Sequence, residues 1–226
     1  MPSQTPRPLG ILSLERGRAA SDTPPPSPPG GLLNPATFEF PVISETIAGA
    51  WAEVVVRGDP ALDVERGAVA ITSNCGFSIR HQAAVAKALK VPVALSSLLL
   101  LPTLLRQLPK SAKIAILSYD STQCGRDLLP LVDPVEQAKV VIGGLEGSKF
   151  WIDEQKHPAP PVDVAAIETD VALCVARLRS EYPDITAILF GCTAFPMVAP
   201  ALRRITKLPI YDITDLCRLI MASVGS

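Results

Sequence analysis

Residues 185–196 read ITAILFGCTAFP, an apolar run followed by a glycine, a cysteine and a proline. The run 185–190 is short and almost wholly apolar, as is typical of a buried strand. Cys192 then follows at the carboxyl end of this strand, just before a predicted helix. Open α/β sheets bind their ligands at this edge. The stretch therefore predicts a ligand site that contains a thiol.

The first half of the chain repeats this pattern. Residues 67–77 read GAVAITSNCGF, an apolar strand that runs into small polar residues and Cys75. Backbone N–H groups at such turns bind carboxylates, and the positive end of a following helix favours the thiolate form. We therefore expect Cys75 and Cys192 to flank the α-carbon of a carboxylate substrate. One thiolate would remove a proton and the opposite thiol would deliver one.

Strands alternate with helices along the whole chain. This order predicts an α/β protein with mostly parallel sheets covered by helices on both faces. Because the two halves look like related units, we expect two pseudo-symmetric lobes with the active site in the cleft between them. The predicted N-terminal lobe is 1–112 and carries Cys75, and the C-terminal lobe is 113–226 and carries Cys192. The closing helix, 213–226, could pack back on the first lobe.

The elements expected in each half follow from the apolar patterns. The predicted strands are 9–14, 67–72, 91–95, 113–118, 140–145, 185–190 and 209–212, and the predicted helices are 79–89, 97–108, 123–131, 163–181, 197–206 and 213–224. Residues 42–56 mix strand and helix signals and receive no assignment.

Composition restricts the class of partner. The chain has 226 residues, of which 48% are hydrophobic, and a formal net charge of −1. A near-neutral surface does little to steer polyanions, so no nucleic-acid partner is expected. The longest apolar run, 93–105, is too short and too interrupted to span a bilayer, so no membrane partner is expected either. The expected partner is a small carboxylate, and apolar helix faces permit a homodimer without requiring one.

The cysteines indicate free thiols. Their number is odd and they form no CxxC pair: Cys75, Cys124, Cys174, Cys192 and Cys217. The N-terminus has no apolar segment of the secretory kind, which favours the reducing cytoplasm. Only two histidines, His81 and His157, are present, which argues against a zinc site. Cys174 and Cys217 are expected in the core, whereas a site role for Cys124 stays open.

A loop rich in proline and glycine occupies residues 22–41. Proline fixes φ and removes a donor, so this segment cannot form a helix or a central strand. It reads either as a flexible linker or as a lid over the pocket. In the second interpretation Phe38 and Phe40 would cover the ligand, and the loop would set specificity.

The motifs at 72–76 (TSNCG) and 191–196 (GCTAFP), with a supporting turn at 118–120, resemble the aspartate/glutamate racemase superfamily over nearly the whole chain. This superfamily includes glutamate, aspartate and hydantoin racemases, arylmalonate decarboxylase and maleate isomerase. The resemblance implies two α/β lobes, a site between them, no cofactor and no metal. By position it implies that Cys75 and Cys192 are the acid/base pair. The residues that would hold the carboxylate are Asn74, Gly76, Phe77, Ser118, Tyr119 and Thr193.

The expected function is therefore a cofactor-independent racemase or epimerase that acts at the α-carbon of an amino acid or related carboxylate. Cys75 argues against decarboxylation, because the decarboxylase lacks the first cysteine. Two alternatives stay open: a cysteine-nucleophile cis–trans isomerase of an unsaturated diacid, and a non-catalytic protein that binds a small carboxylate. Glutamate is not the expected substrate. Residues 12–16 lack the Asp-Ser pair of glutamate racemases, and Ala194 stands in place of their histidine.

Overall fold

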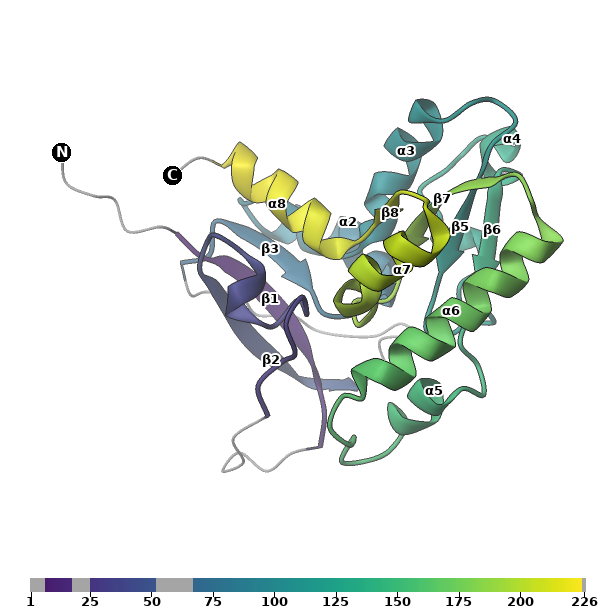
Figure 1. The fold of residues 1–226 in the computed structure, drawn as a ribbon. Coiled ribbons are helices and arrows are strands. Elements are labelled where there is room, and N and C mark those ends of the chain that lie inside the picture. Colours follow the sequence, from purple (N-terminus) through teal and green to yellow (C-terminus); the bar gives the residue numbers. More distant parts are fainter. Residues whose placement is uncertain (1–6, 18–24, 52–66, 225–226) are drawn as a thin grey trace.

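The computed structural model describes residues 7–17, 25–51 and 67–224, apart from the side chains of Ala48 and Trp51. Its strands form two separate four-stranded sheets, and every described strand pair is parallel (Figure 1). The order is β2-β1-β3-β4 in the first sheet and β6-β5-β7-β8 in the second. The same relative order therefore occurs in each half. This confirms the predicted α/β class with two related parallel sheets.

The strands have the following bounds: β1 Leu9–Glu15, β2 Val42–Trp51, β3 Ala70–Ser73, β4 Val93–Ala94, β5 Lys113–Leu117, β6 Val140–Gly143, β7 Ile185–Phe190 and β8 Ile210–Tyr211. The inner strands β3, β5 and β7 are almost wholly buried. In β7 five of the six residues are buried, because a central parallel strand is covered on both faces. Residues 95–112 connect the last strand of the first sheet to the first strand of the second. The predicted lobe boundary at 112 falls in this segment and stays a prediction.

The helices have the following bounds: α2 Gln82–Ala88, α3 Leu101–Gln107, α4 Pro134–Gln137, α5 Lys149–Asp153, α6 Val164–Glu181, α7 Ala199–Thr206 and α8 Ile213–Ser223. Short 3₁₀ helices lie at Pro35–Thr37, Gly76–His81, Ser97–Leu100, Arg126–Leu128 and Phe195–Val198. The longest helix, α6, begins where the Asp163 carboxylate accepts a hydrogen bond from the Ala166 N–H at 3.0 Å. Such a cap satisfies one of the unpaired donors at a helix start.

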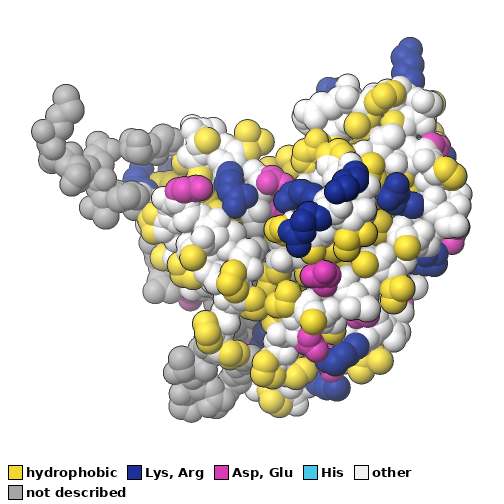
Figure 2. Space-filling view, in the orientation of Figure 1, with side chains coloured by type: hydrophobic (Ala, Val, Ile, Leu, Met, Phe, Trp, Pro, Cys, Tyr) yellow, Lys and Arg dark blue, Asp and Glu magenta, His cyan; other side chains and the backbone are white. Residues whose placement is uncertain are grey.

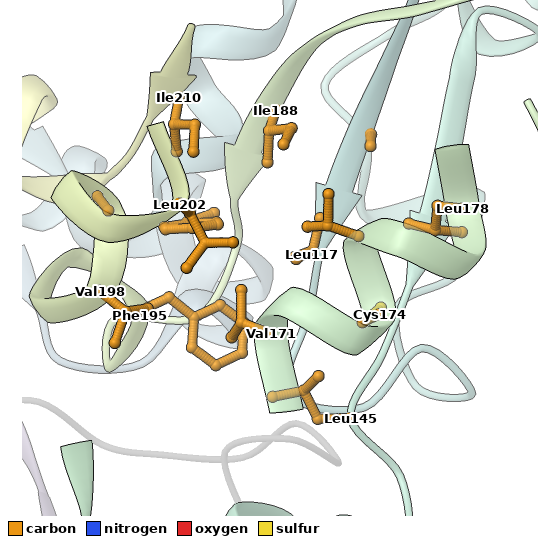
Figure 3. Packing of buried hydrophobic residues seen from close by; sticks show 14 of the residues in the cluster. Leu117, Leu145, Val171, Cys174, Leu178, Ile188, Phe195, Val198, Leu202 and Ile210 are labelled. Carbon is orange, nitrogen blue, oxygen red and sulfur yellow. The ribbon is translucent and has the colours of Figure 1, made fainter. Parts of the chain in front are cut away.

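α6 covers one face of the second sheet. Its side chains Val171, Cys174 and Leu178 point toward Leu117 of β5, and Phe195 packs beside Val171 (Figure 3). The expectation that Cys174 is a core residue is confirmed, since only 5% of it is exposed.

The two sheets exchange helices. α3, which ends the first half of the chain, packs through Leu101 and Leu104 against Ile114 of the second sheet. In return, α8 at the end of the second half packs on the first sheet, where Ile213 contacts the cluster around Leu9 (Figure 1). The burial of each sheet therefore depends on a helix from the other half.

Two segments differ from the sequence-based predictions. The helix expected over 123–131 is wrong, because this segment holds only the 3₁₀ turn Arg126–Leu128. Leu129 precedes Pro130 and takes an extended conformation, since proline disfavours the α region in the residue before it. Residues 42–51, which received no assignment, form the edge strand β2, and residues 52–56 lie outside the described ranges.

Surface features bear on possible partners. Figure 2 shows Lys and Arg side chains gathered over α7, where Arg203, Arg204 and Lys207 are exposed. Arg203 lies 3.9 Å from Asp215, so part of this charge is balanced locally. Among the described residues, no helix combines the length and the apolar character that crossing a bilayer requires.

Candidate active site

Cys75 is held in a rigid turn after β3. The Asn74 N–H donates to the Leu12 carbonyl at 2.9 Å, which continues the sheet pairing by one residue. The Ser73 hydroxyl then accepts a hydrogen bond from the Cys75 N–H at 3.2 Å and lies 2.8 Å from the Ser78 hydroxyl. Because its own backbone and both flanking segments are bonded in this way, Cys75 starts the 3₁₀ helix Gly76–His81 in one defined position.

Cys192 occupies the matching position after β7. The Gly191 N–H donates to the Leu117 carbonyl at 2.8 Å, and the Phe195 N–H donates to the Cys192 carbonyl at 3.2 Å. Phe195 is fully buried among β7 and α6. This side chain anchors the turn, so the GCTAFP stretch fixes the place of its cysteine through packing as well as through hydrogen bonds.

The two turns touch each other. The Thr193 hydroxyl donates to the Asn74 carbonyl, a contact between residues 119 positions apart. Gly76 faces the carbonyl oxygen of Gly191 so closely that a Cβ at position 76 would overlap it. The structure thus brings Asn74, Cys75 and Gly76 together with Cys192 and Thr193 at one junction between the sheets.

The other predicted binding residues have separate environments. Ser118 directly follows β5 and is buried, and its N–H donates to the Gly143 carbonyl at 2.8 Å. Tyr119 packs against both the cluster that contains Cys75 and the cluster that contains Cys192. Phe77 is 95% buried in the core between the sheets. Roles in carboxylate binding stay predictions for all of these residues.

At both thiols, burial opposes the thiolate form that the N–H groups were expected to favour. Burial raises the pKa of the Cys75 thiol to about 11, although the N–H groups of Phe77 and Ser78 lower it. Burial also raises the pKa of Cys192 well above its ordinary range, and only the Ala194 N–H, among nearby backbone groups, opposes this. The donors at each turn therefore exist as predicted, but desolvation outweighs them.

An ion pair that the sequence did not reveal lies beside the thiols. The Arg16 guanidinium, just after β1, donates to both carboxylate oxygens of Glu154, at 3.1 and 2.7 Å. Both charges influence the pKa of Cys75 and of Cys192. Arg16 could have been noticed as a charged residue at a strand end, but Glu154 follows a short helix 138 residues away and carries no comparable signal.

The interpretation of the loop 22–41 as a lid formed by its aromatic residues is wrong for the described part. Phe38 and Phe40 stack on each other at 4.8 Å between ring centroids and pack against the first sheet and α8. The Arg218 guanidinium lies 5.6 Å from the Phe38 ring centroid. These side chains fill a core on the first sheet, apart from both thiol clusters. Residues 22–24 lie outside the described ranges.

The remaining cysteines do not join the thiol pair. Cys217 is fully buried on α8, as expected. Cys124 is buried in the core between the sheets, and its thiol is hydrogen-bonded to the Ser118 side chain. Within the described ranges, no group of three or more His, Cys, Asp or Glu side chains is arranged to hold a metal ion.

Solved structures define the class of this fold. Glutamate racemase isoform RacE1 from Bacillus anthracis matches with a TM-score of 0.57 at 13% identity, over 98% of this chain and 84% of its own. Allantoin racemase from Pseudomonas fluorescens matches with a TM-score of 0.52 at 16% identity, over 96% and 90%. The chain thus has the fold of the aspartate/glutamate racemase-like enzymes, which was the predicted resemblance.

Sequence relatives point to a different activity from that of these structures. A dimethylsulfoniopropionate lyase from Durusdinium sp. clade D is 32% identical over 206 residues, covering 81% of this chain and 66% of its own. Dimethylsulfoniopropionate lyase 3 from Emiliania huxleyi is 27% identical over 241 residues, covering 96% and 59%. The chain therefore spans about three fifths to two thirds of the length of these relatives. No family model matches it.

These relatives correct the predicted function. The sequence analysis led to an amino-acid racemase or epimerase, but the curated relatives are named as lyases. That prediction is wrong, because the motifs around Cys75 and Cys192 reflect a shared fold and not a shared overall reaction. Fold likeness at 13–16% identity does not carry the racemase activity to this chain.

Proposed function

We propose that this chain cleaves dimethylsulfoniopropionate by β-elimination and releases dimethyl sulfide and acrylate. The observation that carries the proposal is the likeness to dimethylsulfoniopropionate lyases over most of the chain. The junction that holds Cys75 and Cys192 supports it, because two thiols there can reach one small ligand.

The reaction needs a base beside a carboxylate. A thiolate removes a proton from the carbon next to the carboxylate, and the electron pair of that C–H bond becomes the new carbon–carbon double bond. The bond to sulfur then breaks, and its electron pair leaves with sulfur as neutral dimethyl sulfide. The first step is the one that a racemase performs, so the same pair of strand-end cysteines suits both reactions.

Elimination differs from racemisation in what the second thiol must do. Inversion requires an acid and a base on opposite faces of the carbon. A neutral leaving group requires no acid, so one of the two thiols is sufficient as the base. The other can remain protonated and donate a hydrogen bond, which agrees with the raised pKa values of Cys75 and Cys192.

The carboxylate becomes more electron-rich as the proton leaves. Backbone N–H groups of the two turns and the side-chain amide of Asn74 are the groups proposed to hold it, because the Thr193 and Ser118 hydroxyls already donate to backbone carbonyls. Donors fixed in place before the reaction stabilise such developing charge at little reorganisation cost. The hydrogen bonds that rigidify both turns supply this fixed geometry.

The test is product formation. The protein is incubated with dimethylsulfoniopropionate, dimethyl sulfide is measured in the headspace by gas chromatography, and acrylate is measured by its vinyl protons in NMR. The expected result is equal amounts of the two products, formed only when active protein is present. A folded protein that forms neither product above the buffer rate would refute the proposal.

A further inference from the structure

The ion pair between Arg16 and Glu154 joins the two halves of the molecule. It is bidentate, with N–O distances of 3.1 and 2.7 Å. The Arg16 side chain is 38% exposed and the Glu154 side chain 20%. A partly exposed ion pair contributes little to stability, so stability alone is a weak reason for this arrangement.

Residues close in sequence to each member of the pair are hydrogen-bonded to Asn74 or to Tyr119. The Leu14 N–H donates to the Asn74 side-chain oxygen at 2.9 Å, which ties the end of β1 to the residue before Cys75. On the other side, the Tyr119 hydroxyl donates to the Trp151 carbonyl at 2.9 Å, one turn before Glu154. The pair therefore lies near enough to both thiols for its two charges to act on their pKa values.

The charges of the pair match those of the proposed substrate. Dimethylsulfoniopropionate is a zwitterion, with a carboxylate and a sulfonium separated by two methylene groups. A guanidinium binds a carboxylate through two parallel hydrogen bonds, and a carboxylate attracts a sulfonium by charge. Tyr119 and Trp151 stack at 6.3 Å between ring centroids next to Glu154, and aromatic faces also attract cations.

We propose that Arg16 and Glu154 determine specificity for a zwitterion, Arg16 by pairing with the substrate carboxylate and Glu154 by pairing with its sulfonium. In the structure the two charges pair with each other. Binding exchanges this one internal pair for two pairs with the substrate. The inference rests on the proposed function, because that function supplies the zwitterionic substrate.

The test compares three probes that cannot release dimethyl sulfide: the zwitterion 3-(trimethylammonio)propionate, the anion propionate and the cation tetramethylammonium. Their affinities for the wild type, Arg16→Gln and Glu154→Gln are measured by ligand-observed NMR titration. Lys149→Gln is the matched control, because it removes an exposed ion pair to Asp153 in the neighbouring helix α5. This control is expected to bind all probes as the wild type does.

The expected pattern is a crossover. Arg16→Gln weakens the binding of the zwitterion and of propionate at least about tenfold. The same variant binds tetramethylammonium as tightly as the wild type does, or more tightly. Glu154→Gln weakens the binding of the zwitterion and of tetramethylammonium to a similar extent. This variant binds propionate as tightly as the wild type does, or more tightly, because Arg16 no longer has to leave its partner. A pair that only clamps the two halves together cannot produce opposite effects on an anion and a cation.

Three results would overturn the inference: equal changes for all three probes, no change in either variant, or no binding of the zwitterion by the wild type. Release of dimethyl sulfide by the same wild-type preparation is measured in parallel. Release of dimethyl sulfide without the crossover would support the lyase function and refute the role proposed for Arg16 and Glu154. The crossover without release of dimethyl sulfide would support zwitterion recognition by the pair and refute the lyase function.

Discussion

The proposed chemistry depends on two thiols, of which Cys75 is buried and Cys192 is half-buried. Burial opposes ionisation at Cys75 and Cys192, while backbone N–H groups at the start of each 3₁₀ helix favour it. A buried base that is protonated at rest still functions if a small fraction ionises, and the thiolate formed is a stronger base than an ordinary one. This balance distinguishes the site thiols from a surface cysteine.

Replacing the thiols tests their role directly. We expect the alanine variant that removes the base, Cys75→Ala or Cys192→Ala, to lower kcat for dimethyl sulfide release by at least about a hundredfold. The alanine variant of the other cysteine should lower kcat less. Cys174→Ala is the control, because it removes a buried thiol from α6. The rates are read by headspace gas chromatography. Full activity in both site variants would exclude a thiol base.

The raised pKa predicts a pH dependence. Because burial raises the pKa of Cys75 to about 11, the thiolate fraction increases about tenfold for each unit by which the pH rises toward that value. If Cys75 is the base, kcat/KM should continue to rise between pH 8 and pH 10. A plateau near pH 8.5, the ordinary thiol value, would show that the active base is not a buried cysteine. Circular dichroism at each pH checks that the protein stays folded.

At the scale of elements, the site depends on how closely two turns approach. Gly76 in the first turn faces the Gly191 carbonyl in the second, with no room for a Cβ. The contact from Thr193 to Asn74 holds the turns at this separation. Glycine is therefore required at position 76 because the second turn packs against it, and not because of the local backbone conformation.

Adding one methyl group at this contact tests the point. Gly76→Ala should lower stability by about 1–3 kcal/mol through overpacking and should lower activity further, because it separates the turns. Gly191→Ala is the matched variant, since its Cβ would lie 3.3 Å from the nearest atom, the Leu117 carbonyl oxygen. Urea unfolding should show a clearly smaller loss for Gly191→Ala. Equal losses would mean that the turns adjust freely.

At the scale of the whole molecule, the two halves are joined by exchanged helices. α3 buries leucines on the second sheet, and α8 buries Ile213 and Leu216 on the first. Each sheet therefore loses part of its cover if the other half unfolds. We infer that the molecule unfolds as one cooperative unit, with the thiol junction at the centre of the contact.

A change on α8 tests this coupling. Ile213 is 1% exposed, so Ile213→Ala should cost about 2–5 kcal/mol, and Ile213→Val about 0.5–1.5 kcal/mol. Hydrogen exchange followed by mass spectrometry should show faster exchange in β7 as well as in β1, although β7 belongs to the other sheet. Faster exchange confined to the first sheet would show that the halves unfold separately.

Some residues of the candidate site could be predicted from the sequence and others could not. The strand-end motifs around Cys75 and Cys192 were visible because apolar runs and turn residues are local patterns. Arg16 and Glu154 were missed, because an ion pair between residues 138 positions apart leaves no periodic signal. The place of Phe38 and Phe40 stayed open between a linker and a lid, because an aromatic pair in a loop has the same sequence pattern whether it covers a ligand or fills a core.

The sequence by itself determined the α/β class, the parallel strands and the two cysteine turns, since these follow from the spacing of apolar and turn-forming residues along the chain. Only the tertiary structure decided that the turns meet, that helices are exchanged between the sheets and that desolvation outweighs the N–H donors at the thiols. These outcomes depend on contacts between distant segments, and a thiol pKa depends on everything that surrounds it. The reaction itself needed the relatives as well, because one fold and one pair of thiols suit both racemisation and elimination.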